Sequence, residues 1–157
     1  MKADASERQP VETFEIRKEI EISAPVGIAF EAVLAQLGPE GEMPGGKPFP
    51  MTIEAWPGGR WFRDLGNHSG HLWGHVQVIK PPTLLEICGP LMMSYPAANH
   101  LQYRLSAEGA GTRLAFLHRA MGLIPPDQRD GLTQGWQYWL ERIRGLAERK
   151  DRKGTKR

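Results

Sequence analysis

The sequence predicts an α+β domain in which a curved antiparallel β-sheet wraps around a long C-terminal helix, with a short helical segment after the first strand. Glycine and proline contribute 18 and 13 of the 157 residues, an excess that favours many turns and short strands over a helical bundle. Successive strand-like segments are separated by tight turns, which is typical of an antiparallel meander. Near the end of the chain a single amphipathic pattern supplies an apolar stripe that the sheet can cover.

The composition is that of a soluble protein with one domain. Hydrophobic residues make up 40% and charged residues 24% of the chain, and its mass of 17.6 kDa leaves little room for a second domain. No stretch approaches the roughly 20 apolar residues that a membrane span needs. Cys88 is the single cysteine, so an intrachain disulfide is impossible. We therefore expect a cytoplasmic protein in a reducing compartment.

The net charge of +2 is concentrated at the C-terminus, where basic residues dominate from 149 to 157. We expect a disordered N-terminus over 1–12, a domain over 13–148 and a basic, flexible tail over 149–157. Because the folded body is not basic, no nucleic-acid partner is expected.

The first two elements follow from hydrophobic periodicity. Residues 15–22 alternate and predict a half-buried strand, with its apolar side chains on one face. That face carries Phe14, Ile16, Ile20 and Ile22. Pro25 can occupy the first turn of a helix, and apolar residues then recur at helical spacing until Gly38. Residues 38–50 are rich in glycine and proline and predict a loop.

Strand signals then repeat over 51–56, 60–65, 71–79, 84–88, 100–105 and 112–121. The sequence Trp56-Pro57-Gly58-Gly59 predicts a type II turn with Gly58 at positive φ. Cys88 falls inside a predicted strand and is interpreted as a small buried apolar residue.

The last predicted element is a helix with a wide apolar stripe, opened near Pro125 and Pro126. The stripe consists of Trp136, Trp139, Leu140, Ile143, Leu146 and Ala147.

Six short motifs resemble those of the START-like (SRPBCC, Bet v 1-like helix-grip) superfamily. In chain order they are 24–32 (APVGIAFEA), 57–61 (PGGRW), 70–76 (GHLWGHV), 81–86 (PPTLLE), 111–114 (GTRL) and 135–140 (GWQYWL). Within the superfamily the chain is most similar to bacterial proteins that resemble the C-terminal domain of the activator of heat-shock protein 90 ATPase. Two features depart from that pattern: a segment over 38–44 replaces a tryptophan-containing one, and the chaperone-binding domain of the eukaryotic activators is missing.

The aromatic residues of the sheet and the last helix allow two interpretations. Core packing explains most of them. The resemblance implies in addition a ligand cavity between sheet and helix. The candidate cavity residues are Trp61, Phe62, Trp73, His75, Tyr103, Phe116, His118, Trp136 and Leu140.

No motif demands catalysis, a metal or a cofactor. His71 and His75 lie four residues apart on a strand, about 13 Å, which is too far to share one zinc ion. No serine lies in a nucleophile elbow. Glu54, Asp64 and Glu86 could form a carboxylate pair for acid–base chemistry. They lie on different predicted strands, however, and the sequence does not show which of them share a face of the sheet.

The favoured hypothesis is non-enzymatic binding of a small apolar or amphipathic molecule, such as a lipid or an aromatic polyketide-like compound. One alternative is an enzyme of the polyketide cyclase or dehydratase type that uses the same cavity with a histidine as acid and base. Another is a protein-interaction module that acts on a chaperone or similar partner, which predicts an exposed apolar patch. A homodimer is a further possibility that the sequence does not decide.

Overall fold

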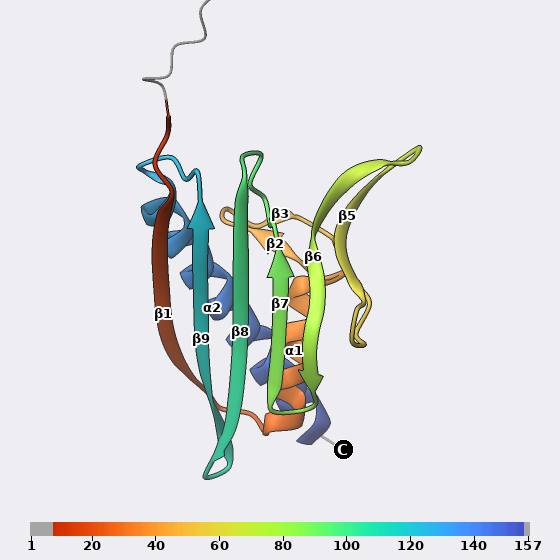
Figure 1. Ribbon diagram of the computed structural model, residues 1–157. Coiled ribbons are helices and arrows are strands. Elements are labelled where there is room, and N and C mark those ends of the chain that lie inside the picture. The colour runs from red at the N-terminus through yellow and green to blue at the C-terminus, as the bar shows by residue number, and fades with distance from the viewer. Residues whose placement is uncertain (1–7, 156–157) are drawn as a thin grey trace, which may run out of the picture.

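Strand β1 (Glu12–Ile22) forms one edge of a seven-stranded antiparallel sheet in the computed structural model, which describes residues 8–155 (Figure 1). The strand order across the sheet is β1-β9-β8-β7-β6-β5-β4. The remaining strands of this sheet are β4 (Thr52–Ile53), β5 (Arg60–Gly66), β6 (Ser69–Lys80), β7 (Leu84–Gly89), β8 (Ala97–Glu108) and β9 (Gly111–Gly122). A meander therefore runs from β4 to β9, and the last strand, β9, pairs with the first strand, β1.

The alternation of β1 decides which face of the sheet is buried. Ile16, Ile20 and Ile22 are buried, as predicted. The opposite face of the strand is charged, and Arg119 and Arg113 on β9 pair with its glutamates. Because charged side chains discourage edge-to-edge pairing, this pattern also protects the exposed edge of the sheet.

Both helices cover the same face of the sheet (Figure 1). Helix α1 (Val26–Leu37) follows Pro25, and helix α2 (Gln128–Thr155) lies behind strands β1, β9 and β8 in the view of the figure. The predicted arrangement of a sheet around a long C-terminal helix is confirmed. We call the space between the sheet and the two helices the interior, and the uncovered side of the sheet the outer face.

The predicted domain limits differ from the observed elements at the C-terminal end. Helix α2 continues to Thr155, so the boundary set at 148 falls inside the helix. Lys150 forms an ion pair with Glu31 of helix α1, which ties this part of α2 to the domain. Residues 1–7 of the expected disordered N-terminus and residues 156–157 of the expected tail lie outside the described residues. Within 8–155, neither helix has the length and apolar character needed to cross a bilayer.

The segment 38–53 is more ordered than a loop. It contains a short hairpin of β2 (Glu42–Met43) and β3 (Lys47–Pro48), and the predicted strand 51–56 is reduced to Thr52 and Ile53 of β4, which pair with β5. Strands β5 and β6 then form a long hairpin whose far end projects beyond the sheet (Figure 1). Two register shifts in this pair, between Trp61 and Phe62 and between Asp64 and Gly66, increase its local twist.

The turn before β5 gives a first testable prediction. Gly58 has φ of 83°, and Gly59 N donates to Trp56 O at 2.8 Å, as a type II turn requires. A Cβ at Gly58 would meet no atom within 4 Å, so backbone strain alone decides the effect of a substitution. We expect Gly58→Val to lower the free energy of unfolding by about 1 kcal/mol or more. Gly58→Asn should cost less, since asparagine tolerates this conformation. Urea unfolding of both variants is the measurement, and equal stability of the valine variant and wild type would contradict the turn assignment.

Candidate functional site

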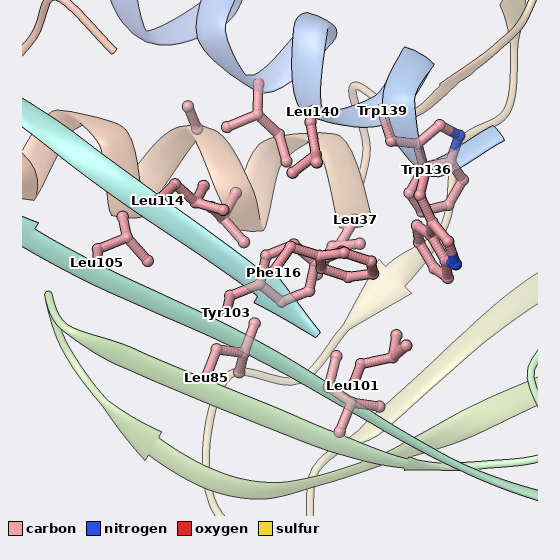
Figure 2. Close-up of a cluster of buried hydrophobic side chains, with 14 of the residues drawn as sticks. Leu37, Leu85, Leu101, Tyr103, Leu105, Leu114, Phe116, Trp136, Trp139 and Leu140 are labelled. Atoms are coloured by element: carbon pink, nitrogen blue, oxygen red, sulfur yellow. The ribbon is translucent and has the colours of Figure 1, made fainter. Parts of the chain in front are cut away.

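A continuous row of aromatic side chains runs through the interior, from strand β8 across helix α2 to the β5–β6 hairpin. Figure 2 shows its first part, where Tyr103 and Phe116 point from the sheet toward Trp136 and Trp139 of α2. The aromatic row consists of Tyr103, Phe116, Trp136, Trp139, Trp73 and Trp61. Successive ring centres lie 4.8–6.2 Å apart, and the rings of Trp139 and Trp73 are parallel. Each ring is at most 3% exposed, so the row is the centre of the core.

A chain of buried hydrogen bonds crosses this core from helix to sheet. Trp136 Nε1 donates to His118 Nδ1 at 3.0 Å, and His118 Nε2 lies 2.7 Å from Asn99 Oδ1. Asn99 Nδ2 in turn donates to the backbone oxygens of Gly89 and Pro90, at 3.1 and 3.4 Å. We call Trp136, His118 and Asn99 the polar relay.

The chemistry of the relay fixes the proton positions on His118. An indole N–H can only donate, so Nδ1 must be the unprotonated, accepting nitrogen. Nε2 therefore carries the proton and donates to Asn99, whose amide is then oriented with its NH₂ toward the backbone oxygens. Burial lowers the pKa of His118 to about 4, because the charged imidazolium would lose its hydration there.

Other polar groups in and around the interior have no hydrogen-bond partner within the described part of the chain. The Tyr103 hydroxyl, the indole N–H of Trp73 and one terminal nitrogen of Arg63, Nη1, are buried, and none of them makes a hydrogen bond with a described residue. Burial raises the pKa of Tyr103, so the hydroxyl keeps its proton. Trp61 is different, because its Nε1 donates to Leu37 O at 2.7 Å and holds the end of α1. Each unpartnered group costs about 1–3 kcal/mol of stability.

Seven of the nine candidate cavity residues lie in the interior and are buried. These are Trp61, Trp73, Tyr103, Phe116, His118, Trp136 and Leu140. They pack against one another, and five pockets found over residues 8–155 lie at the surface, each lined by at most one of the nine candidates. An open cavity among these side chains therefore stays a prediction.

Phe62 and His75 lie on the outer face, which corrects their assignment to the interior. Phe62 directly follows the inward Trp61, and neighbouring residues of a strand point to opposite faces. The Arg60 guanidinium lies 4.7 Å from the centre of the Phe62 ring. His75 is exposed because the bulge at Trp73 inserts one residue into β6 and reverses the alternation.

Cys88 is exposed on the outer face, where it pairs in register with His75 and His100, so its interpretation as a buried residue was wrong. Among residues 8–155, no group of three or more histidine, cysteine or acidic side chains is arranged to hold a metal ion. The Arg60 guanidinium and backbone N–H bind Glu54 and lower its carboxyl pKa to about 2, so Glu54 is an ion-pair partner rather than an acid–base group.

Sequence reasoning missed three residues of the site: Asn99, Arg63 and Phe49. Asn99 precedes Leu101, Tyr103 and Leu105 at alternate positions of a strand, which is a visible signal for an inward polar side chain. Arg63 and Phe49 gave no such signal, since their contact joins a loop to a distant strand.

Comparisons with known proteins show the fold. No protein-family model matches the chain, and no curated protein sequence matches it. A solved structure of an uncharacterized protein from Rhizobium leguminosarum is similar with a TM-score of 0.69 and 19% identity, over 89% of this chain and 97% of that one. A protein from Chromobacterium violaceum is similar with a TM-score of 0.65 and 20% identity, over 85% and 96% of the two chains. Ara h 8.0201, of the Bet v 1 family, is similar with a TM-score of 0.59 and 14% identity, over 88% and 98%. The chain therefore has the Bet v 1-like helix-grip fold.

The relay predicts a loss of stability in acid. Between about pH 6.5 and pH 4 the unfolded chain binds a proton at His118 that the folded chain does not, so the unfolding free energy falls as pH falls through this window. The expected loss is on the order of 3 kcal/mol. In His118→Gln an amide can still accept from Trp136 and donate to Asn99, but it does not titrate. Urea unfolding at pH 7 and pH 4.5 should show a smaller loss in this variant than in wild type, whereas the exposed His71→Gln control should behave as wild type. Equal losses in all three proteins would contradict a neutral His118.

The Tyr103 hydroxyl gives a prediction of opposite sign. Tyr103→Phe removes only an unpartnered buried polar atom, so we expect it to raise the free energy of unfolding by about 1 kcal/mol. Tyr138→Phe, at a half-buried position of α2, should change stability little. A clear destabilisation by Tyr103→Phe would mean that the hydroxyl is satisfied in solution.

Proposed function

We propose that this chain binds a small apolar or amphipathic molecule, without catalysis, in the interior between the sheet and helix α2. The observation that carries the proposal is the buried Tyr103 hydroxyl, which lies at one end of the aromatic row and makes no hydrogen bond with any of the described residues 8–155. Buried polar groups in folded proteins nearly always have partners, and an exception calls for an explanation. A ligand that accepts or donates a hydrogen bond at this position would supply one.

The packing of the interior limits how such a molecule binds. The aromatic side chains touch one another, so a ligand enters only when some of them change rotamer or helix α2 shifts. A dry cavity of 400 Å³ would cost on the order of 10 kcal/mol, which equals the stability of a typical domain. An empty protein with its interior closed by side chains avoids this cost.

The polar relay argues against the cyclase-type alternative. That mechanism needs a histidine that titrates in a pocket and reaches the substrate. Both ring nitrogens of His118 are engaged within the protein, and His75 is exposed on the outer face. A proton transfer at His118 would first have to break one of these two hydrogen bonds.

A protein-interaction role is the second candidate, and exposed apolar side chains near and on the β5–β6 hairpin favour it. Trp56, Leu65 and Leu72 are 57%, 54% and 46% exposed. The motif resemblance to the activator of heat-shock protein 90 ATPase would make a chaperone the partner. This candidate places the binding surface on the hairpin and not in the interior.

Tryptophan fluorescence distinguishes the two candidates. Fatty acids, flavonoids and aromatic polyketides titrated into the protein should give a saturable blue shift or quenching, because Trp73, Trp136 and Trp139 lie in the interior. The signal should persist in Trp56→Phe, which removes only an exposed indole, and decrease in Trp139→Phe. Native mass spectrometry of freshly purified protein should in addition reveal a co-purified small molecule. A signal that disappears in Trp56→Phe and is unchanged in Trp139→Phe would overturn the interior site in favour of the hairpin surface.

A further inference from the structure

Two residues with buried hydrogen-bond donors, Arg63 and Trp73, contact the Phe49 ring at the end of the aromatic row opposite Tyr103. The Arg63 guanidinium carbon is 3.8 Å from the centre of the Phe49 ring, and the Trp73 ring centre is 5.7 Å from it. Arg63 Nη1 and Trp73 Nε1 are buried, and neither makes a hydrogen bond with any residue in the range 8–155.

The β5–β6 pairing places Arg63 and Trp73 at diagonal positions on one face of the hairpin. Arg63 pairs in register with His71, and Trp73 follows two positions later on β6. Diagonal neighbours of this kind on one face of an antiparallel pair lie within reach of long and aromatic side chains. The Phe49 ring comes from the segment before β4, whose backbone is held by the bond from Phe49 N to Gly41 O at 2.8 Å.

The chemistry of the pair calls for an anion. Guanidinium and indole N–H groups donate and cannot accept, so neither group can satisfy the other. The Arg63 guanidinium carbon lies over the Phe49 ring, and its buried Nη1 can donate to an oxygen acceptor placed beside the ring.

No carboxylate within residues 8–155 forms an ion pair with Arg63, and the adjacent Asp64 accepts from Gly66 N instead. The positive charge at this end of the interior is therefore not neutralised by an ion pair.

We propose that Arg63 and Trp73 bind the oxyanion of an amphipathic acid whose apolar body lies along the aromatic row. This inference rests on the proposed function and narrows its ligand class to a molecule with one terminal carboxylate or similar oxyanion. A planar guanidinium binds a carboxylate through two parallel hydrogen bonds, and such charge-assisted bonds are among the strongest in proteins.

Calorimetric titration with decanoate and decan-1-ol, which share a chain length, tests the headgroup separately from the apolar body. Wild type should bind decanoate about tenfold or more tightly than decan-1-ol. Arg63→Met keeps an apolar stem over Phe49 and should weaken decanoate binding far more than decan-1-ol binding, so that the preference disappears. Trp73→Phe removes the indole N–H and should weaken decanoate binding several-fold.

Arg60→Met is the matched control, because Arg60 lies on the same strand but on the outer face, with its guanidinium bound to Glu54. It should retain the full preference for decanoate. Arg63→Lys, which keeps the charge and loses the planar fork, should be intermediate, and circular dichroism checks that each variant is folded.

The outcomes distinguish a failure of the oxyanion site from a failure of the interior binding site. Equal affinities of wild type for the two ligands, or an unchanged preference in folded Arg63→Met, would overturn the oxyanion site while the interior binding function stands. Absence of binding of either ligand to wild type would overturn the interior site itself, and the oxyanion site with it.

Discussion

The buried hydrogen bond from Trp136 to His118 is the interaction on which the arrangement of helix and sheet depends. Apolar contacts along the aromatic row favour burial but are not directional, so they tolerate small shifts of the helix. A hydrogen bond in the core is different, because a shift that breaks it leaves an indole N–H and an imidazole nitrogen unpaired at a cost of about 1–3 kcal/mol each. The bond therefore fixes the position of α2 over β9, and Asn99 extends the same constraint to the last residue of β7, Gly89, and to Pro90 after it.

The constraint has a chemical consequence, because it holds only while His118 is neutral. Protonation would place a second N–H on the ring, directed at the indole N–H of Trp136. The low pKa of His118 and the geometry of the relay thus both indicate that the buried imidazole is neutral. The histidine acts as a fixed connector between two neutral partners, and this role is incompatible with a role as a freely titrating acid or base.

Local patterns in the sequence were sufficient for much of the fold. The alternation of Ile16, Ile20 and Ile22, the stripe around Trp136 and the turn at Gly58 each arise from neighbouring residues, and the structure confirms all three. Residues were assigned to the wrong face of the sheet where the alternation of a strand is interrupted. One inserted residue at the Trp73 bulge sends His75 to the outer face, and no local signal distinguishes a bulge from a regular strand. The Arg63–Phe49 contact was not predictable either, because it joins segments whose proximity follows only from the completed hairpin.

Polar groups in this core are of two kinds, and the difference bears on function. The relay is closed, since every donor in it meets an acceptor, and its effect is to make the packing of helix on sheet specific. The groups at the two ends of the aromatic row, Tyr103 at one and Trp73 with Arg63 at the other, are open. A domain has only about 5–15 kcal/mol of total stability, so replacing these unpartnered groups with apolar ones would raise its free energy of unfolding appreciably. The strand register would allow such a replacement, because it buries apolar side chains at the neighbouring positions. Stability alone therefore does not account for these side chains, whereas an apolar molecule with a polar group at its end would satisfy donors at the end of an apolar row.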